Sequence, residues 1–344
     1  MSFEQSETAG RAEADAVLPP PPYPRPAPAT FHQHKQNLLL EIDRHNSSNA
    51  PRRVRTRRRA VITFASAAVA CTAIAAVVLP SIRTTPAPTT PPASTASVQL
   101  LEQAALAATA NPATPPKATQ FTYVKVSGHT TALSETADGT MQRLPQDESY
   151  EQWTSVDGSA RTLQRKNGSG DTLLDAPGPG NLNVPTYRFL AQLPTEPAAL
   201  LTHIYQDTNR NHGPGSDSTT GPDQEAFVII GDLLRASIAP PEISAALYRA
   251  AARIPGVITV PDAVDAVGRH GIAVARVHDG ERIEWIFDKK TTRLLGERTT
   301  LLKDNAWGKA GTPITSTAIT NNGITNEAGQ PPTPNPSQNT NPTT

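Results

Sequence analysis

The chain has 344 residues with 31 basic and 31 acidic side chains, and 34 of its residues are proline. Proline is therefore about twice as frequent as its usual ~5%. The stretches in which the prolines are concentrated are excluded from forming a compact fold. The zero net charge hides a split, because residues 1–59 carry four more basic than acidic side chains and residues 80–344 four more acidic than basic. This mildly acidic larger part excludes the basic surface expected of a nucleic-acid-binding protein.

The N-terminal segment, residues 1–59, is predicted to be mostly disordered. Residues 1–30 are polar and proline-rich, so they cannot bury enough apolar surface to offset chain entropy, although a PxxP spacing there also suits a polyproline ligand. Residues 31–45 predict a helix of about three turns, too short to be stable alone. Its three histidines are His32, His34 and His45. We interpret them as solvated side chains, because no cysteine or carboxylate stands at metal-ligand spacing.

Residues 60–79 (AVITFASAAVACTAIAAVVL) are twenty consecutive residues without a charge. At about 1.5 Å per residue, a helix of this length covers the roughly 30 Å hydrocarbon core of a bilayer. Six arginines lie between Arg52 and Arg59, whereas the residues that follow carry only Arg83 before a Pro/Thr-rich stretch. This asymmetry predicts a single-pass transmembrane helix, with the N-terminus in the cytoplasm and the C-terminal part outside the cell membrane. The arginines would then contact anionic headgroups rather than nucleic acid.

Cys71 is the single cysteine and lies inside this predicted helix, so no intrachain disulfide can form. It could instead be the lipidation site of a lipoprotein signal, but residues 68–70 lack the usual leucine and the apolar run continues beyond it. A cleaved signal peptide is a second alternative, although such peptides place their charged region at the extreme N-terminus. A membrane anchor fits the position better, and the outer part must be held together by its core alone.

A folded domain is predicted over residues 98–308, beyond an extended Pro/Thr stalk at residues 80–97. Residues 98–110 have leucines and alanines at helical spacing. Residues 119–127 alternate as a strand, with both aromatic residues on one face.

The middle of this domain combines a hairpin with helices. Two strand-like runs within residues 150–166 flank an Asp-Gly pair, which is a strong hairpin signal. Residues 166–184 predict a Gly/Pro loop. Three helical patterns then follow between residues 195 and 255, with Thr195 as the expected N-cap of the first.

Residues 270–302 predict three strands joined by tight turns, with Ile283, Trp285 and Phe287 on the buried face of the middle strand. Residues 309–344 predict a disordered tail. The order of strands, then helices, then strands favours an α+β fold, in which helices cover one face of a curved antiparallel sheet.

Four strings carry a resemblance to a known family: YRFLAQLPTEPAALLTHIY, FVIIGDLLRASIAPPEISAALYRAAARIPGV, DAVDAVGRHGIAVAR and EWIFDKKTTRLLGER. They resemble a family of actinobacterial single-pass membrane proteins of unassigned function, which have a basic cytoplasmic N-terminus, one membrane helix and an extracytoplasmic domain of similar length. Members are often encoded beside extracytoplasmic-function sigma factors, so the resemblance implies a sigma-factor-linked partner. It covers most of residues 98–303 and brings no catalytic motif. By fold alone, the expected sheet is similar to lipoprotein-carrier and envelope-stress-sensor domains, which bind acyl chains in a groove.

We assign no catalytic, cofactor-binding or metal-binding residue from the sequence. HExxH, GxSxG and P-loop motifs are absent, and NGSGD at residues 167–171 does not lead from a buried strand into a helix, as a phosphate cradle would. His270 and His278 would lie about 26 Å apart along one straight strand, too far to share a metal. Four carboxylates could form acid/base pairs, although surface charge is the simpler interpretation. They are Asp262, Asp265, Glu281 and Glu284.

Three functions stay open. The first, which the topology favours, is a membrane-tethered protein without catalytic activity, whose extracytoplasmic domain binds an envelope lipid or protein ligand, with a role in envelope signalling. The second is a regulator of a sigma factor through residues 31–45, although the cysteine ligands of zinc-type anti-sigma factors are missing there. The third is an exported hydrolase using Asp or Glu. An apolar groove between sheet and helices would support the first.

Overall fold

A computed structural model describes residues 90–110, 114–136, 140–212 and 220–332. The predicted cytoplasmic segment (1–59), the predicted transmembrane helix (60–79) and most of the stalk lie outside the described residues. Within the part of the chain that is described, no helix is both long enough and apolar enough to cross a bilayer.

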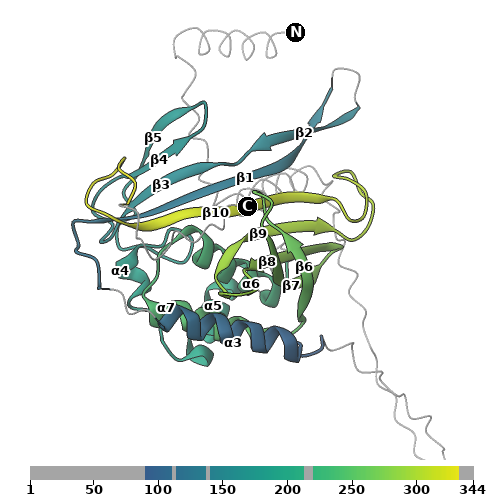
Figure 1. Cartoon of the computed structure of the whole chain (residues 1–344), viewed down its shortest axis with the longest axis horizontal. Coiled ribbons are helices and arrows are strands. Elements are labelled where there is room, and N and C mark those ends of the chain that lie inside the picture. The colour runs from purple at the N-terminus through teal and green to yellow at the C-terminus, as the bar shows by residue number, and fades with distance from the viewer. Residues whose placement is uncertain (1–89, 111–113, 137–139, 213–219, 333–344) are drawn as a thin grey trace, which may run out of the picture.

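The fold is built on one ten-stranded antiparallel sheet (Figure 1). The strands are β1 (Phe121–Glu135), β2 (Met141–Asp147), β3 (Tyr150–Ser155), β4 (Thr162–Lys166), β5 (Gly170–Leu174), β6 (Val257–Val264), β7 (His270–His278), β8 (Glu281–Phe287), β9 (Leu294–Leu301) and β10 (Pro313–Thr325). Their order is β5-β4-β3-β1-β10-β9-β8-β7-β6, and β2 pairs with the far half of β1. The long strands β1 and β10 pair at the centre and join the two halves.

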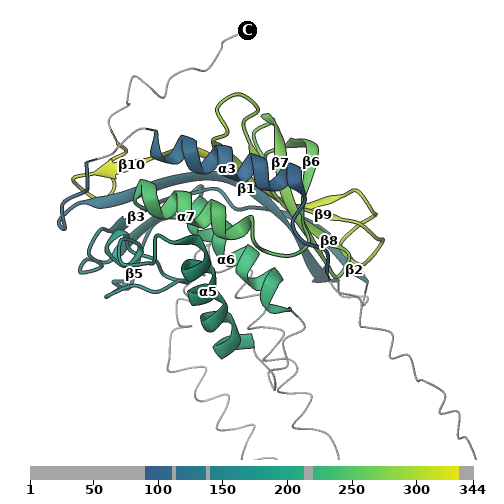
Figure 2. The same cartoon turned by 90° about the horizontal axis from the view of Figure 1, so that it is seen from below.

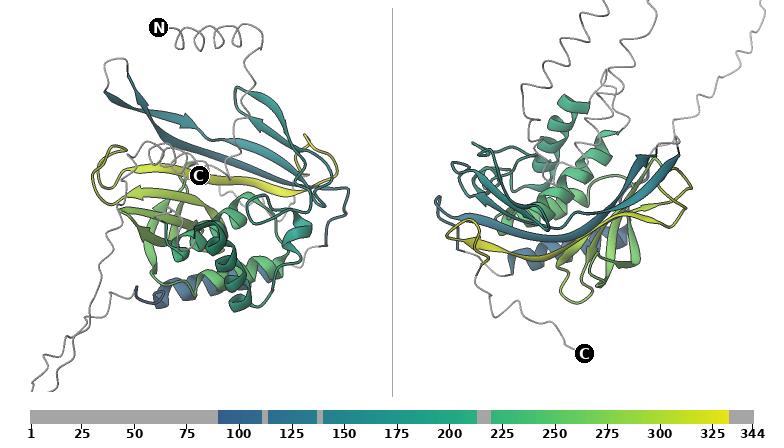
Figure 3. Two further views of the ribbon diagram at one scale, coloured as in Figure 1. Left: turned by 180° about the vertical axis from the view of Figure 1, so that it is seen from behind. Right: turned by 90° about the horizontal axis from the view of Figure 1, so that it is seen from above.

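Five helices in the described residues complete the α+β fold. They are α3 (Thr95–Thr109), α4 (Tyr187–Leu190), α5 (Pro197–His212), α6 (Pro222–Ala236) and α7 (Pro241–Ala251). The sheet is curved, and α5, α6 and α7 lie on its concave side, as Figures 2 and 3 show. Helix α3 packs along α7 and reaches β6 and β7 at the end of the sheet. The predicted α+β fold with a large antiparallel sheet is therefore confirmed.

The start of α5 differs from the prediction in its cap. The Glu196 carboxylate accepts the backbone N–H groups of Ala198 at 3.0 Å and Ala199 at 2.7 Å. These are orphan donors of the first helical turn, which need such a partner. Glu196 therefore has the capping role that the sequence suggested for Thr195.

The main core lies between the helices and the concave face of the sheet. Phe227 of α6 stacks on Trp285 of β8 with ring centroids 4.0 Å apart, and Tyr248 of α7 meets the ring of Phe287 edge-on at 5.8 Å. Ile283, two residues before Trp285, belongs to the same buried cluster. The predicted buried face of the middle strand is confirmed, because alternate residues of a strand share one face.

The predicted disordered tail is wrong for residues 309–332. Strand β10 lies inside this segment and pairs with β1 on one side and β9 on the other. The error has a physical reason: β10 (PITSTAITNNGIT) contains few large apolar residues, but its threonines and isoleucines are β-branched and suit a central strand. Residues 333–344 lie outside the described residues.

The stalk prediction is also wrong at its C-terminal end. The backbone N–H of Gly256 donates to the carbonyl of Pro91 at 2.7 Å, and that of Ser94 donates to the carbonyl of Val257 at 2.8 Å. These bonds attach the residues before α3 to the start of β6. The folded region therefore runs over residues 90–332 rather than 98–308.

Candidate functional site

The contact between α6 and the sheet depends on one glycine. A Cβ atom on Gly231 would lie 2.5 Å from Nε1 of Trp285 and 3.0 Å from Oε2 of Glu297. Real Cβ atoms do not approach so closely, so only glycine lets α6 pack directly on the indole edge and the carboxyl group. Glycine inside a helix costs about 1 kcal/mol relative to alanine, which indicates that this close approach matters to the fold.

Polar side chains gather at this contact, in what we call the Glu297 cluster. Its members are Tyr150 of β3, Asp232 and Arg235 of α6, Trp285 of β8, and Glu297 and Thr299 of β9. Glu297 lies directly opposite Trp285 in the sheet register, and Thr299 is two residues further along the same face of β9. Arg235 donates a hydrogen bond to its helix neighbour Asp232. Arg235 and Asp232 act electrostatically on both Tyr150 and Glu297, so these groups lie together at the interface between α6 and the concave face, and Thr299 lies next to them along β9.

Burial gives the cluster unusual protonation behaviour. Glu297 is only 8% exposed, and desolvation raises the pKa of its carboxyl to about 7, with Arg235 lowering it and Asp232 raising it. Burial also raises the pKa of Tyr150, against the opposing effect of Arg235, so its hydroxyl keeps its proton. The Glu297 carboxyl can thus change its charge near neutral pH inside a poorly solvated environment.

Three polar atoms of the cluster have no hydrogen-bond partner among the described residues: Nε1 of Trp285, Nε of Arg235 and Oγ1 of Thr299. All three can donate a hydrogen bond. Buried donors without partners are rare in folded proteins and call for an explanation such as an ordered water or a ligand. The cluster therefore has three buried donors without partners, on α6, β8 and β9, together with one carboxyl of changeable charge.

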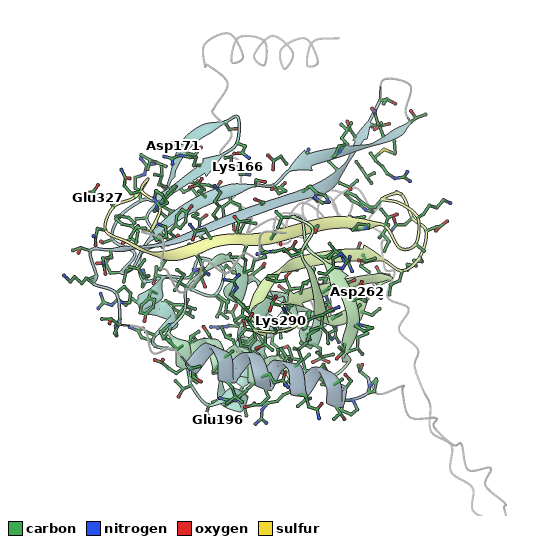
Figure 4. The ribbon with its side chains drawn as sticks, in the orientation of Figure 1. Lys166, Asp171, Glu196, Asp262, Lys290 and Glu327 are labelled. Carbon is green, nitrogen blue, oxygen red and sulfur yellow. The ribbon has the colours of Figure 1, made fainter. Side chains whose placement is uncertain are left out.

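The carboxylates that the sequence nominated do not join this cluster. Asp262 lies on the surface with its side chain 62% exposed, and it contacts Lys289 at 3.2 Å and His270 at 3.5 Å (Figure 4). Asp265 is buried and is held by Arg269 at 2.6 Å. That arginine also donates to the backbone carbonyls of residues 295 and 319, so it fastens a turn to the sheet.

Glu284 is buried on the opposite face of the sheet from Glu297. It accepts hydrogen bonds from Arg282 at 2.9 Å, Arg298 at 2.6 Å and the hydroxyl of Thr300 at 3.0 Å. Glu281, the fourth candidate, is half-buried at the start of β8, opposite His278. With Asp262 on the surface and Asp265 and Glu284 each sealed by arginines, these four carboxylates do not form the shared acid/base pocket that the hydrolase hypothesis required.

Nor do the histidines within the described residues gather into a metal site. His270 and His278 lie at the two ends of β7, and His203 is half-buried in α5. In the described part of the chain, no group of three or more His, Cys, Asp or Glu side chains is placed to hold a metal ion. Within the NGSGD stretch, residues 167–169 form the hairpin turn after β4 and Gly170 and Asp171 begin β5, so the stretch does not open a helix.

Sequence reasoning missed the Glu297 cluster, although two signals were present. The first is Gly231 inside an otherwise apolar helical run, and the second is the charged Glu297 inside a strand. The register shift of β9 beside residues 286 and 287 conceals the second signal, because it changes which residues of the strand face the helices.

No protein-family model and no curated protein matches this chain. The likeness to actinobacterial single-pass membrane proteins therefore stays a prediction from the sequence.

Proposed function

We propose that the chain is a single-pass membrane protein whose extracytoplasmic domain binds an envelope lipid or protein ligand without catalysing a reaction, and that binding serves envelope signalling. The topology rests on the sequence, where the arginines of residues 52–59 precede the apolar residues 60–79. With this topology, the folded region of residues 90–332 follows the membrane span and lies outside the cell membrane.

The Glu297 cluster is the observation that carries the proposal. Its three unpartnered donors, on Trp285, Arg235 and Thr299, suit the oxygen atoms of a ligand headgroup. The cluster also borders the apolar core between α6 and the sheet, where Phe227 stacks on Trp285. An amphipathic molecule would place its oxygens on the donors and its apolar part along this core, so a lipid is the favoured ligand.

Binding at the cluster requires α6 to lift from the sheet, because the donors are sealed beneath it. The contact includes Gly231, where the helix backbone itself covers Trp285 and Glu297. The likeness to lipoprotein carriers, in which a curved sheet and helices enclose an acyl chain, is an analogy of fold alone. It belongs to the proposal because it suggests where the apolar part would lie.

Native mass spectrometry of the full chain purified in detergent, with solvent extraction of bound lipid, tests the ligand. We expect a lipid on the wild type, at least fivefold less of it on Trp285→Phe, which lacks the indole N–H, and an unchanged amount on Trp307→Phe. Trp307 is a matched control because it lies in the connection between β9 and β10. If the wild type carries no bound lipid and crosslinks to no partner, the proposal loses its basis.

Labelling of single cysteines with a membrane-impermeant maleimide tests the topology. In a Cys71→Ser background, we expect Ser169→Cys, in the exposed β4–β5 turn, to be labelled in intact cells. We expect Ser6→Cys to be labelled only after lysis. Equal labelling of both positions in intact cells would contradict the proposed orientation.

A further inference from the structure

The outer face of the sheet carries a buried aromatic cluster that the helices do not cover. Tyr123 of β1, Trp153 of β3 and Leu163 of β4 lie in one cross-strand row. The alternate residues of β1 face the other way and pack against Ile238, between α6 and α7. Even so, Tyr123 is 1% exposed and Trp153 is fully buried. Something other than the helical layer must therefore cover this row.

The segment that follows β10, residues 326–332, covers the row. It is the loop drawn in yellow beside β3 and β4 in Figure 1, and Figure 4 labels its Glu327 at that end of the sheet. The indole Nε1 of Trp153 donates a hydrogen bond to the backbone carbonyl of Gln330 at 2.8 Å. The buried indole therefore has its polar atom paired with the backbone of this segment.

Two glycines let the segment lie close to the sheet. Gly323 of β10 is directly opposite Tyr123 in the register, and a Cβ on it would lie 2.8 Å from Cβ of Pro332. Gly329 has a φ of +88° and lies beside Leu163. A Cβ atom added to Gly329 would lie 3.5 Å from Cδ2 of Leu163. A φ in that range is easy only for glycine, so the turn that brings Gln330 over Trp153 depends on it.

The chemistry of this contact is that of proline-rich peptide recognition. The covering segment reads Gly-Gln-Pro-Pro over residues 329–332, and the sequence continues as Thr-Pro-Asn-Pro. Proline-rich segments adopt a preformed extended helix with solvated carbonyls, and they dock on aromatic-lined grooves at low entropic cost. The contact described above has both features of such recognition. The Trp153 indole donates to a backbone carbonyl of the segment, and Pro332 packs beside it on the sheet. The guanidinium carbon of Arg165 lies over the Trp153 ring, 5.1 Å from its centroid, at the edge of this contact.

We propose that Tyr123, Trp153 and Leu163 form a binding site for an extended proline-containing peptide, which the chain's own residues 329–332 occupy in cis. A proline-containing segment of another polypeptide can take the site when the chain's own segment leaves it. This inference is independent of the Glu297 cluster, which lies on the opposite face of the sheet. A tethered segment acts at an effective concentration in the millimolar range, so the occupied site should bind a free peptide only weakly.

Fluorescence polarisation with a labelled peptide of residues 328–337 (AGQPPTPNPS) tests the site. The full chain is shortened after Asn326, which removes the cis segment, and a matched control is shortened after Pro332, which keeps it. We expect the first form to bind the peptide at least tenfold more tightly than the second. In the first form, Trp153→Phe should weaken binding at least threefold, and a peptide with alanine at 331 and 332 should not bind. Equal affinity of the two forms, or no binding by a folded shortened chain, would overturn the proposal.

Gly329→Ala in the full-length chain covers the case in which the shortened chain does not fold. Alanine is strained at the φ of +88°, so this change in the segment weakens its turn over Trp153 and leaves the sheet residues of the site unchanged. A folded Gly329→Ala variant should bind the peptide more tightly than wild type, and equal binding rejects the site. Sedimentation of the full chain then identifies the source of the peptide. Dimers that require residues 327–344 would show that a second copy supplies it, and monomers would exclude a second copy as the source.

Discussion

Two buried glutamates on neighbouring strands show how differently the two faces of the sheet treat a charge. Glu284 of β8, on the outer face, is paired with Arg282 and Arg298 and also accepts from Thr300. Glu297 of β9, on the helix-covered face, lies near one arginine, and that arginine donates to Asp232 instead. The first carboxylate is a satisfied structural ion. The second has its pKa raised to about 7 by burial, and perturbed groups of this kind concentrate at functional sites.

The largest expected effect comes from neutralising the satisfied glutamate. Glu284→Gln leaves Arg282 and Arg298 without their shared counter-charge. We expect it to lower the free energy of unfolding by about 3 kcal/mol, the lower end for a broken buried pair because both arginines keep some exposure. Urea unfolding of the full chain in detergent measures this through tryptophan fluorescence, since all three tryptophans lie in the folded region. An unfolding midpoint equal to that of the exposed control Glu135→Gln would contradict it.

Neutralising Glu297 should have the opposite effect on stability, and that effect should depend on pH. The pKa of Glu297 in the folded chain, about 7, is above the ordinary 4.5, so the folded chain holds a proton that the unfolded chain loses. The contribution of this group to stability should therefore be fully present below about pH 4.5 and be lost as the pH rises through 7, by on the order of 3 kcal/mol. Glu297→Gln should remove this fall and be more stable than wild type at pH 8. Parallel urea curves of the two proteins between pH 5 and pH 8 would contradict the assignment.

Gly231→Ala tests the close approach of α6 to the sheet. Alanine is the better helix former, but its methyl group would overlap Trp285 and Glu297. We expect a net loss of about 1 to 3 kcal/mol, as for other overpacked cores. Gly221→Ala at the start of α6 is the matched control, because a Cβ there meets nothing within 4 Å. Thermal unfolding of both variants decides, and equal midpoints would show that α6 does not lie this close to the sheet.

The smallest effect is expected where a charge pair is exposed. Arg249 of α7 and Glu102 of α3 form a 2.7 Å ion pair, with side chains 36% and 46% exposed. Glu102→Gln should cost less than about 1 kcal/mol, and the difference should shrink in high salt because exposed pairs are screened. A loss of stability as large as that of Glu284→Gln would mean that burial does not determine how much an ion pair contributes to stability.

Regular periodicity made much of the fold predictable from the sequence. Helix α6 and the meander from β7 to β9 repeat their apolar residues at the spacing of their element, so local pattern and tertiary burial agree. The pattern failed for β10, whose threonines have no apolar alternation, although the strand is central. It failed again for residues 326–332, because the aromatic row that they cover is assembled from three separate strands.

The candidate site could not be predicted for a related reason. Glu297 is distinguished by its burial under a glycine of a distant helix, not by a motif around it. Asp262, Asp265 and Glu284 looked equally eligible in the sequence, because neither exposure nor an arginine partner from another strand can be read from local spacing. Charge in a sequence shows which groups can ionise, and only the packing shows which of them are buried and which are paired with a counter-charge.

The retention of bound lipid at two pH values tests the central claim, that the Glu297 cluster holds the ligand. Wild type and Glu297→Gln, purified at pH 6 as full chains in detergent, would be washed at pH 6 or pH 8 before lipid extraction. Ionised Glu297 competes with ligand oxygens for the donors of Trp285 and Arg235, so wild type should lose most of its lipid at pH 8. Glu297→Gln should keep its lipid at both pH values. Equal retention by wild type at pH 6 and pH 8 would contradict the account.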